Sequence, residues 1–132
     1  MGTFSDYWEN LIINTLFNKA AWTEVTIWVG LCTSDTALSD SATPSEPTAA
    51  SYQRQDTSNA TWAAAASGAT SNGVAIEFTT AVQSWCTIYG FAGFDATTAG
   101  NMLFCATLTA ARDVTVNDNA RFAVGELDVA LD

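Results

Sequence analysis

Residues 85–108 read WCTIYGFAGFDATTAGNMLFCATL, and this stretch predicts a β-hairpin. Two runs within it, 85–94 and 102–108, are rich in the aromatic and β-branched residues that pack well on a pleated surface. Between them, residues 95–101 (DATTAGN) include a glycine and an asparagine, which suit the positive φ angles of a turn. We expect this hairpin to form the centre of a sheet.

Both faces of the first predicted strand are apolar. A strand with one face in water would alternate apolar and polar side chains. Strict alternation here gives one face Trp85, Thr87, Tyr89 and Phe91, and the other face Cys86, Ile88, Gly90, Ala92 and Phe94. Each face therefore needs a cover. We expect one cover from the rest of the domain, and the other from either the N-terminal segment or a neighbouring protein.

Residues 3–17 predict an amphipathic helix. Thr3 followed by Asp6 resembles a capping box, in which side chains satisfy the free amides of the first turn. Apolar residues recur at spacings of three and four and share one stripe: Phe4, Tyr7, Trp8, Leu11, Ile12 and Leu16. The stripe would pack on the protein's own sheet or, as the alternative, between subunits.

The remaining chain predicts short strands joined by polar turns. Strand candidates are residues 24–31, 52–57, 74–78, 122–124 and 126–132, and in the last of these Leu127, Val129 and Leu131 face inward. Residues 33–50 are rich in Ser, Thr and Asp and contain both prolines, which predicts an exposed loop. The sequence thus predicts a single domain, 1–132, with the helix at 3–17 followed by a β domain at 24–132. This fold class is mainly β, an antiparallel β-sandwich or small barrel with one N-terminal helix.

The charge balance limits the possible partners. The net charge is −10, with only four basic residues, so direct nucleic-acid binding and attraction to anionic membranes are not expected. The opening residues, MGTFSDYWENL, lack the basic flank and apolar core of a signal peptide, and we expect synthesis in a cytoplasm. Charged residues make up only 14% of the chain, which is typical of a surface that is polar but uncharged or of one partly buried in an assembly.

The cysteines are Cys32, Cys86 and Cys105, and histidine is absent from the sequence. A zinc site needs four ligands, so three scattered cysteines without histidine argue against one. We expect three buried free thiols that act as small hydrophobes. One internal disulfide, or a cross-link from a leftover thiol to another subunit, remains open.

The sequence predicts no catalytic, cofactor-binding or metal-binding residue. A catalytic triad would need a histidine as its base, and the sequence contains none. No phosphate-binding glycine loop is present either. Oxygen-rich turns occur at Asp35, Asp40 and residues 117–119, but none has the spacing of a calcium loop, so ordinary turn chemistry is the better interpretation. This outcome favours a structural or binding protein without enzymatic activity.

Several stretches together resemble a family of small bacteriophage virion proteins. They are FSDYWENLIINTLF (4–17), VTIWVGLCTSD (25–35), YQRQ (52–55), SNGVAIEFTTAVQSW (71–85), TIYGFAGFDATTAGNMLF (87–104) and FAVGELDVALD (122–132). Members are described as tail fibre proteins, and similar small β proteins serve as capsid decoration or cement. The resemblance covers nearly the whole chain, rests on structural motifs, and implies a virion component assembled in the host cytoplasm.

The leading functional hypothesis is a capsid decoration or cement protein that reinforces the head lattice through inter-subunit contacts. The alternative is a phage tail fibre or minor tail protein, and a second alternative is a carbohydrate-binding module that uses exposed aromatics such as Trp62 or Tyr52. The expected partners are capsid or tail proteins and further copies of the chain, with a trimer favoured. Interface residues predicted from the sequence are Phe4, Tyr7, Trp8, Leu11, Trp28, Pro44 and Pro47.

Overall fold

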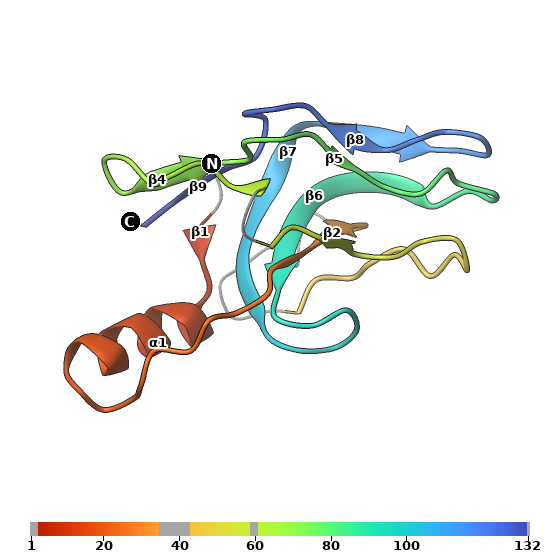
Figure 1. Ribbon diagram of the computed structural model, residues 1–132. Coiled ribbons are helices and arrows are strands. Elements are labelled where there is room, and N and C mark those ends of the chain that lie inside the picture. Colours follow the sequence, from red (N-terminus) through yellow and green to blue (C-terminus); the bar gives the residue numbers. More distant parts are fainter. Residues whose placement is uncertain (1–2, 35–42, 59–60, 132) are drawn as a thin grey trace.

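The computed structural model describes residues 3–34, 43–58 and 61–131 (Figure 1). Within these residues the elements are β1 (Thr3–Phe4), α1 (Asp6–Leu16), β2 (Trp28–Cys32), β3 (Gln55–Asp56), β4 (Ala69–Ser71), β5 (Ile76–Glu77), β6 (Cys86–Phe94), β7 (Met102–Val114), β8 (Arg121–Phe122) and β9 (Asp128–Ala130). The strands form a sheet of order β1-β7-β6-β2-β3 and two short ribbons, β4-β9 and β5-β8, and every pairing is antiparallel. The predicted fold class, mainly β with one short helix near the N-terminus, is confirmed.

The central hairpin is confirmed as β6 and β7, which lie in the middle of the five-stranded sheet. Its turn places Ala99 and Gly100 at φ of 52° and 74°, and an Asp95 carboxylate oxygen accepts a hydrogen bond from Asn101 N at 2.7 Å. The prediction that the second strand ends at residue 108 is wrong. β7 continues to Val114, because its exposed second half still pairs with the start of β6 although it lacks an apolar pattern.

A bulge changes which β6 side chains share a face. The register shifts between Ile88, which faces Arg112, and Gly90, which faces Thr107. The extra residues at this irregularity lie in β7, and the disrupted ladder departs from regular alternation. Ile88 and Phe91, three residues apart in β6, are both buried in the core that also contains Trp85. The strict alternation predicted for this strand is therefore wrong at Ile88.

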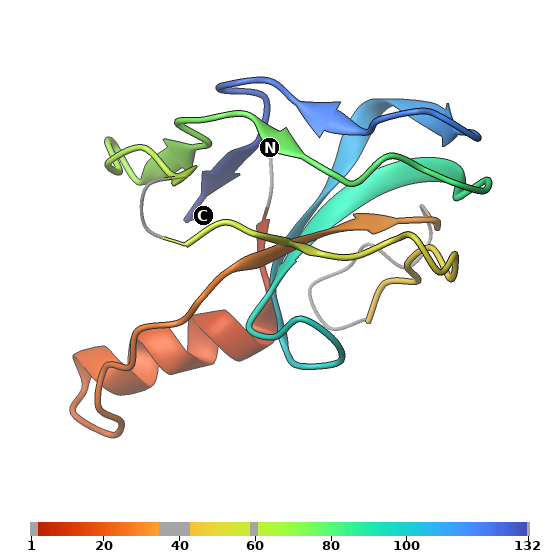
Figure 2. The same cartoon turned by 45° about the vertical axis from the view of Figure 1, so that its right-hand side comes forward.

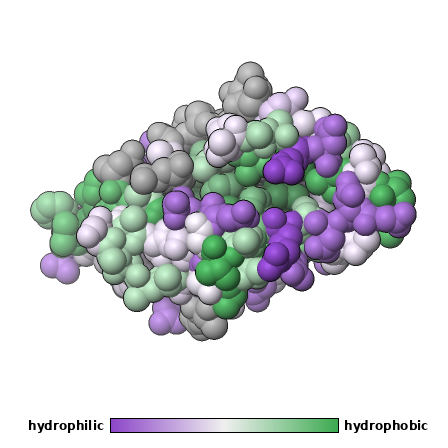
Figure 3. All heavy atoms as spheres, turned by 90° about the horizontal axis from the view of Figure 1, so that it is seen from above, coloured by the Kyte–Doolittle hydropathy of each residue, from purple (hydrophilic) through white to green (hydrophobic). Residues whose placement is uncertain are grey.

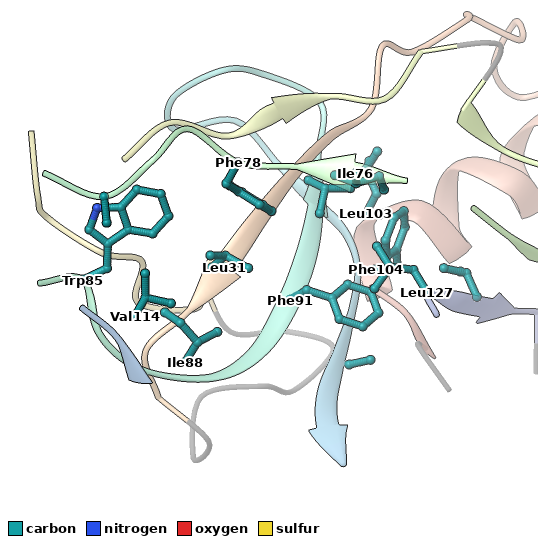
Figure 4. Close-up of a cluster of buried hydrophobic side chains, with 14 of the residues drawn as sticks. Leu31, Ile76, Phe78, Trp85, Ile88, Phe91, Leu103, Phe104, Val114 and Leu127 are labelled. Carbon is teal, nitrogen blue, oxygen red and sulfur yellow. The ribbon is translucent and has the colours of Figure 1, made fainter. Parts of the chain in front are cut away.

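The main core lies between the hairpin and the two ribbons. Figure 4 shows its side chains converging, with Trp85, Ile88 and Val114 at one end and Phe104 and Leu127 at the other. A second, smaller cluster occupies the opposite face of the sheet: Cys32, Ala92, Phe94, Met102 and Cys105. Both faces of the hairpin are therefore covered by the chain itself.

The second cover comes from the region predicted to be an exposed loop. Pro44 and Pro47 are buried, and Thr33 N donates a hydrogen bond to Ser45 O at 2.8 Å. The prediction of an exposed loop is wrong for these residues, because this part of the chain folds back over the sheet. The predicted turn at Asp35 and Asp40 lies outside the described residues.

Smaller corrections concern the two ends of the chain and one thiol. The helix begins at Asp6 with Ser5 as its cap, because Thr3, predicted as the cap, pairs with Cys105 in β1. Leu131, predicted to face inward, is 54% exposed. Cys86 is exposed at a φ of 69°, whereas Cys32 and Cys105 are buried as predicted, and these three described thiols form no disulfide. The described residues contain no helix that is long and apolar enough to span a membrane.

Candidate interaction surface

Helix α1 is fixed to the sheet at its N-terminus and projects away from the body (Figures 1 and 2). Ser5 N donates a hydrogen bond to Leu103 O at 2.8 Å, and the Ser5 hydroxyl donates to Met102 O. The same hydroxyl accepts a hydrogen bond from Trp8 N at 3.4 Å, which caps the first turn. The base of the helix is thus held on β7, while the rest of it extends beyond the sheet.

Helix α1 carries apolar residues on two opposite sides. None of its residues is fully buried. Trp8, Leu11 and Ile12 are half-buried on the side facing the body. At 100° per residue, Ile13 and Phe17 lie on the far side, where their exposed fractions are 53% and 66%.

The end of α1 is a formed structure and not a frayed turn. Asn18 adopts the left-handed conformation, with φ of 57°. Asn18 N donates to Thr15 O at 3.2 Å, and Lys19 N donates to Asn14 O at 2.7 Å. These two bonds form a Schellman motif, which satisfies carbonyls at a helix end. The side chains at this end are therefore presented on a defined backbone.

The exposed apolar end of this projection, here called the α1 tip, consists of Ile13, Leu16, Phe17 and Trp22. Leu16 and Trp22 are 73% and 59% exposed, and Trp22 packs edge-on against Trp8 with ring centroids 5.8 Å apart. The tip exposes on the order of 500 Å² of apolar side-chain surface, taking about 150–250 Å² for each aromatic side chain. Apolar surface of this size is comparable to the largest exposed patch on a typical monomer, and such patches are often functional.

An apolar groove of about 330 Å³ lies beside the base of α1. Its walls contain no charged side chain among the described residues, and the large residues that line it are Phe4, Trp8, Val25, Ile27, Trp62, Leu103, Phe104 and Val129. Trp8 belongs to the groove and also contacts Trp22 of the tip. The groove and the tip are therefore adjacent parts of one apolar region.

Charges are separated along α1. Asp6 and Glu9 lie in the first turn, and Lys19 follows the end of the helix. None of the three forms an ion pair with another described residue. Along the chain, acidic residues therefore lie in the first turn of the helix and a basic residue lies just beyond its end.

A buried polar cluster lies on the other side of the sheet, centred on Arg54. The Arg54 guanidinium donates to both carboxylate oxygens of Glu46, at 2.6–3.1 Å, and to the carbonyls of Ala96 and Ala99, at 2.7 and 2.8 Å. It also stacks over the Phe94 ring at 3.4 Å from the ring centre. These contacts join the folded-back loop to the turn of the central hairpin.

The residues of this cluster have a structural role. The Tyr52 hydroxyl donates to Glu46 at 2.7 Å and accepts from Leu31 N at 2.8 Å. Burial, and then the negative charge of Glu46, raises the pKa of Tyr52 well above its usual value. Burial likewise raises the pKa of the neighbouring Cys32 thiol to about 12. Both groups stay protonated at neutral pH, and neither is activated as a nucleophile or base.

A second groove, of about 840 Å³, opens between β7 and β8 on the face shown in Figure 3. Its floor includes Phe91 and Ala106, and its rim carries both cations and carboxylates. Arg121 pairs with Glu77 at 2.8 Å, whereas Arg112 has no ion pair within the described residues. The mixed charge of this rim selects no single class of ligand.

The structure places the predicted interface residues unevenly. Tyr7 is 46% exposed, while Phe4, Trp8, Leu11 and Trp28 are half-buried and Pro44 and Pro47 are buried. The sequence reasoning missed Ile13, Phe17 and Trp22. Ile13 and Phe17 form an i, i+4 apolar pair on the side of the helix opposite the predicted stripe, and this spacing was the available signal.

The two aromatic residues proposed as a sugar platform differ in their surroundings, because Tyr52 is packed among other rings and Trp62 lines the apolar groove. The Tyr52 ring packs on Phe78 and Trp85. Trp62 is half-buried, donates to Thr57 Oγ1 at 3.1 Å and packs edge-on against Phe104. Among the residues that the structure describes, no group of three or more potential metal-ligating side chains comes together.

Comparison with known protein families finds one match over almost the whole chain. Residues 3–130 match the family described as podophage GP4 fiber I protein gp80. A search of curated proteins finds no match.

Proposed function

The chain belongs to the family of the podophage GP4 fiber I protein gp80, and from this premise we propose that it is a structural component of a phage fibre. The matched description is a fibre protein, so it supports the tail-fibre alternative better than the capsid-decoration hypothesis that led the sequence analysis. A virion location follows from the same description. The proposed role is architectural, without catalysis.

The observation that carries this proposal is the projecting helix. Helix α1 has no buried residue and carries apolar side chains on two opposite sides, one of which is in contact with water. Apolar surface left in water does not stabilise a free domain, so it favours a partner that covers it. The main core and the Arg54 cluster lie elsewhere and hold the body together without the tip. These features support the α1 tip as the proposed assembly surface.

The partners that this surface fits are virion proteins, including further copies of the chain. Of the residues predicted from the sequence, Tyr7 stays in this proposed interface, and Ile13, Leu16, Phe17 and Trp22 join it. A homo-oligomer, for which the sequence favoured a trimer, is part of the proposal. Low charge on the tip suits a stable interface, because the centres of such interfaces are depleted in charged residues.

Quantitative mass spectrometry of separated virion parts tests this function. Particles that carry the chain are dissociated into heads and tails with their fibres, and the copy number is measured in each fraction. A major capsid protein and a tail-tube protein serve as internal standards for cross-contamination. The fibre proposal expects the chain in the tail and fibre fraction. Recovery of many copies on isolated heads, or absence from the virion, would overturn it.

A further inference from the structure

We infer that the groove between β7 and β8 receives an extended segment of another virion protein, which adds there as a strand. The gap that this segment fills, here called the open seam, lies between residues 106–113 of β7 and residues 118–122. The inference rests on the proposed assembly role and specifies how a partner is held. Strand addition to the isolated chain can be measured independently of where the protein sits in the virion.

The outer edge of β7 is paired along only part of its length. On the side away from β6, β1 pairs with β7 at Phe104 and Cys105. Because the peptide groups of an antiparallel strand face one side at every second residue, those of Thr107 face the same side as those of Cys105, beyond β1. Residues 108–111 have no ladder partner in β6 either. Among the described residues, no backbone hydrogen bond links the two sides of the open seam, so this part of β7 is an edge on which another chain can pair.

Residues 118–122 offer a second edge across the open seam. Phe78 N donates a hydrogen bond to Ala120 O at 2.9 Å, so the peptide groups of the next residue, Arg121, point away from β5. Among the described strands, β8 pairs with β5 alone. Two strand edges therefore line the groove, β7 on one side and β8 on the other.

The floor between these two edges is part of the main core. Leu31, Ile88 and Phe91 line the groove and are only 1–4% exposed. Successive side chains of a strand point to opposite faces, so every second side chain of an added strand reaches this floor and the others face water. The rim charges do not identify the ligand, whereas a main chain with donors and acceptors along both of its edges matches the edges of β7 and β8.

Strand β1 shows how a strand occupies this side of β7. It pairs with β7 and contacts β9, which follows β8 in the chain. Its Phe4 packs edge-on against Phe104, with ring centroids 6.4 Å apart. In Figure 1, β1 and β9 lie toward the left of the view and β8 lies toward the right. One end of the gap between β7 and the C-terminal strands is thus filled by a strand, and the open seam is the other end.

The described part of the chain has no spare strand to donate to a second copy. Its alternating apolar stretches are residues 25–29, 74–78 and 127–131, and each contributes buried side chains to the main core. A second copy would have to unfold part of its own core to donate one of them. The occupant is therefore assigned to a different virion protein, as an extended segment with apolar side chains at alternate positions.

Binding of a fluorescent synthetic peptide to the full chain tests strand addition. The probe has about eight residues, to match the open β7 edge at about 3.3 Å per residue, and alternates valine with threonine between terminal lysines. Fluorescence anisotropy should show saturable binding. Ala110→Trp should weaken binding by about tenfold, because Ala110 is exposed and lines the groove. Ala64→Trp, at an exposed position outside the groove, is the matched control, and both variants should keep the circular dichroism spectrum and melting temperature of the wild type.

Two further readouts separate strand addition from adhesion to an apolar surface. The same peptide with N-methylated valine amides keeps its side chains but loses the donors of one edge, and it should not bind. The unmodified peptide should slow amide hydrogen exchange at Thr107 and Arg121, because the N–H groups of both residues lie on the edges that it covers. Absence of probe binding, equal binding of the methylated peptide, unchanged exchange at both amides, or full binding by Ala110→Trp would overturn the inference.

Sedimentation equilibrium distinguishes the other source of a strand. Self-association of the wild type that Ala110→Trp abolishes would assign the open seam to a second copy and overturn the stated partner. Recovery of the chain outside the tail and fibre fraction would overturn the proposed function and would change none of these readouts.

Discussion

Replacing Arg54 tests whether the folded-back loop is held by the buried polar cluster. The Arg54 side chain is 6% exposed, and that of Glu46 is 20% exposed. In Arg54→Ala the Glu46 carboxylate loses its neutralising charge, and the carbonyls of Ala96 and Ala99 lose their donors. Removing one member of a buried ion pair costs about 3–5 kcal/mol. The whole domain is stabilised by about 5–15 kcal/mol, so the variant should fold but unfold at much lower denaturant.

The size of this effect is set by the charge that is left behind. Adding about 1.5–3 kcal/mol for each charged hydrogen bond would overstate the loss, because these bonds share one guanidinium and are not additive. The double variant Arg54→Met with Glu46→Gln leaves no buried charge and keeps an acceptor for the Tyr52 hydroxyl. It should therefore be more stable than Arg54→Ala, although it removes more of the native contacts.

Equilibrium unfolding in urea, followed by tryptophan fluorescence, measures both variants against the wild type. Arg112→Ala is the matched control, because Arg112 is exposed and forms no ion pair within the described residues, and its change should stay within about 0.5 kcal/mol. A loss below about 1 kcal/mol for Arg54→Ala would refute the reasoning. A double variant less stable than Arg54→Ala would refute the assignment of the loss to an uncompensated charge.

Three further changes test other parts of the fold. Gly93→Ala should lower stability by about 1–3 kcal/mol in urea unfolding, because its added Cβ would lie 2.4 Å from the Phe104 ring; an unchanged midpoint would contradict this packing. The pKa of Cys32 is raised from 9.0 to about 12, and that of Tyr52 is raised above 10.0, so the unfolded chain releases these protons first. The free energy of unfolding should therefore not depend on these two groups below pH 9, and above pH 9 it should fall by about 1.4 kcal/mol per pH unit for each group that titrates. Cys32→Ala should remove the part of this fall that begins near pH 9. An unchanged pH profile in that variant would refute the assignment to Cys32. Asn18→Gly should keep or raise the melting temperature and Asn18→Ala should lower it, since alanine resists the left-handed conformation; the opposite order would contradict the described helix end.

The amino-acid sequence determined the parts of this fold that depend on local pattern. The hairpin of residues 85–108 was predictable because apolar runs and a glycine-containing turn are local signals. The helix was predictable from spacings of three and four, and the absence of histidine argued against a catalytic triad. The resemblance to phage virion proteins rested on the same ordered stretches and agrees with the matched fibre family.

The tertiary structure decided what depends on distant parts of the chain. Pro44 and Pro47 are in a stretch whose composition is typical of an exposed loop, yet they are buried, because the ion pair of Arg54 with Glu46 draws that stretch over the sheet. The register shift after Ile88 places Ile88 in the same core as Phe91, because register is set by pairing with β7 and not by the local pattern.

The candidate site shows the same division. Periodicity predicted an apolar stripe on α1, but the stripe alone does not determine which side of the helix packs against the body. Only the anchoring of Ser5 on β7 fixes that side, and it leaves Ile13 and Phe17 facing outward. Local sequence thus sets which segments are helix or strand, whereas contacts between remote residues decide which of their surfaces remain for a partner, because burial is a property of the whole packed chain.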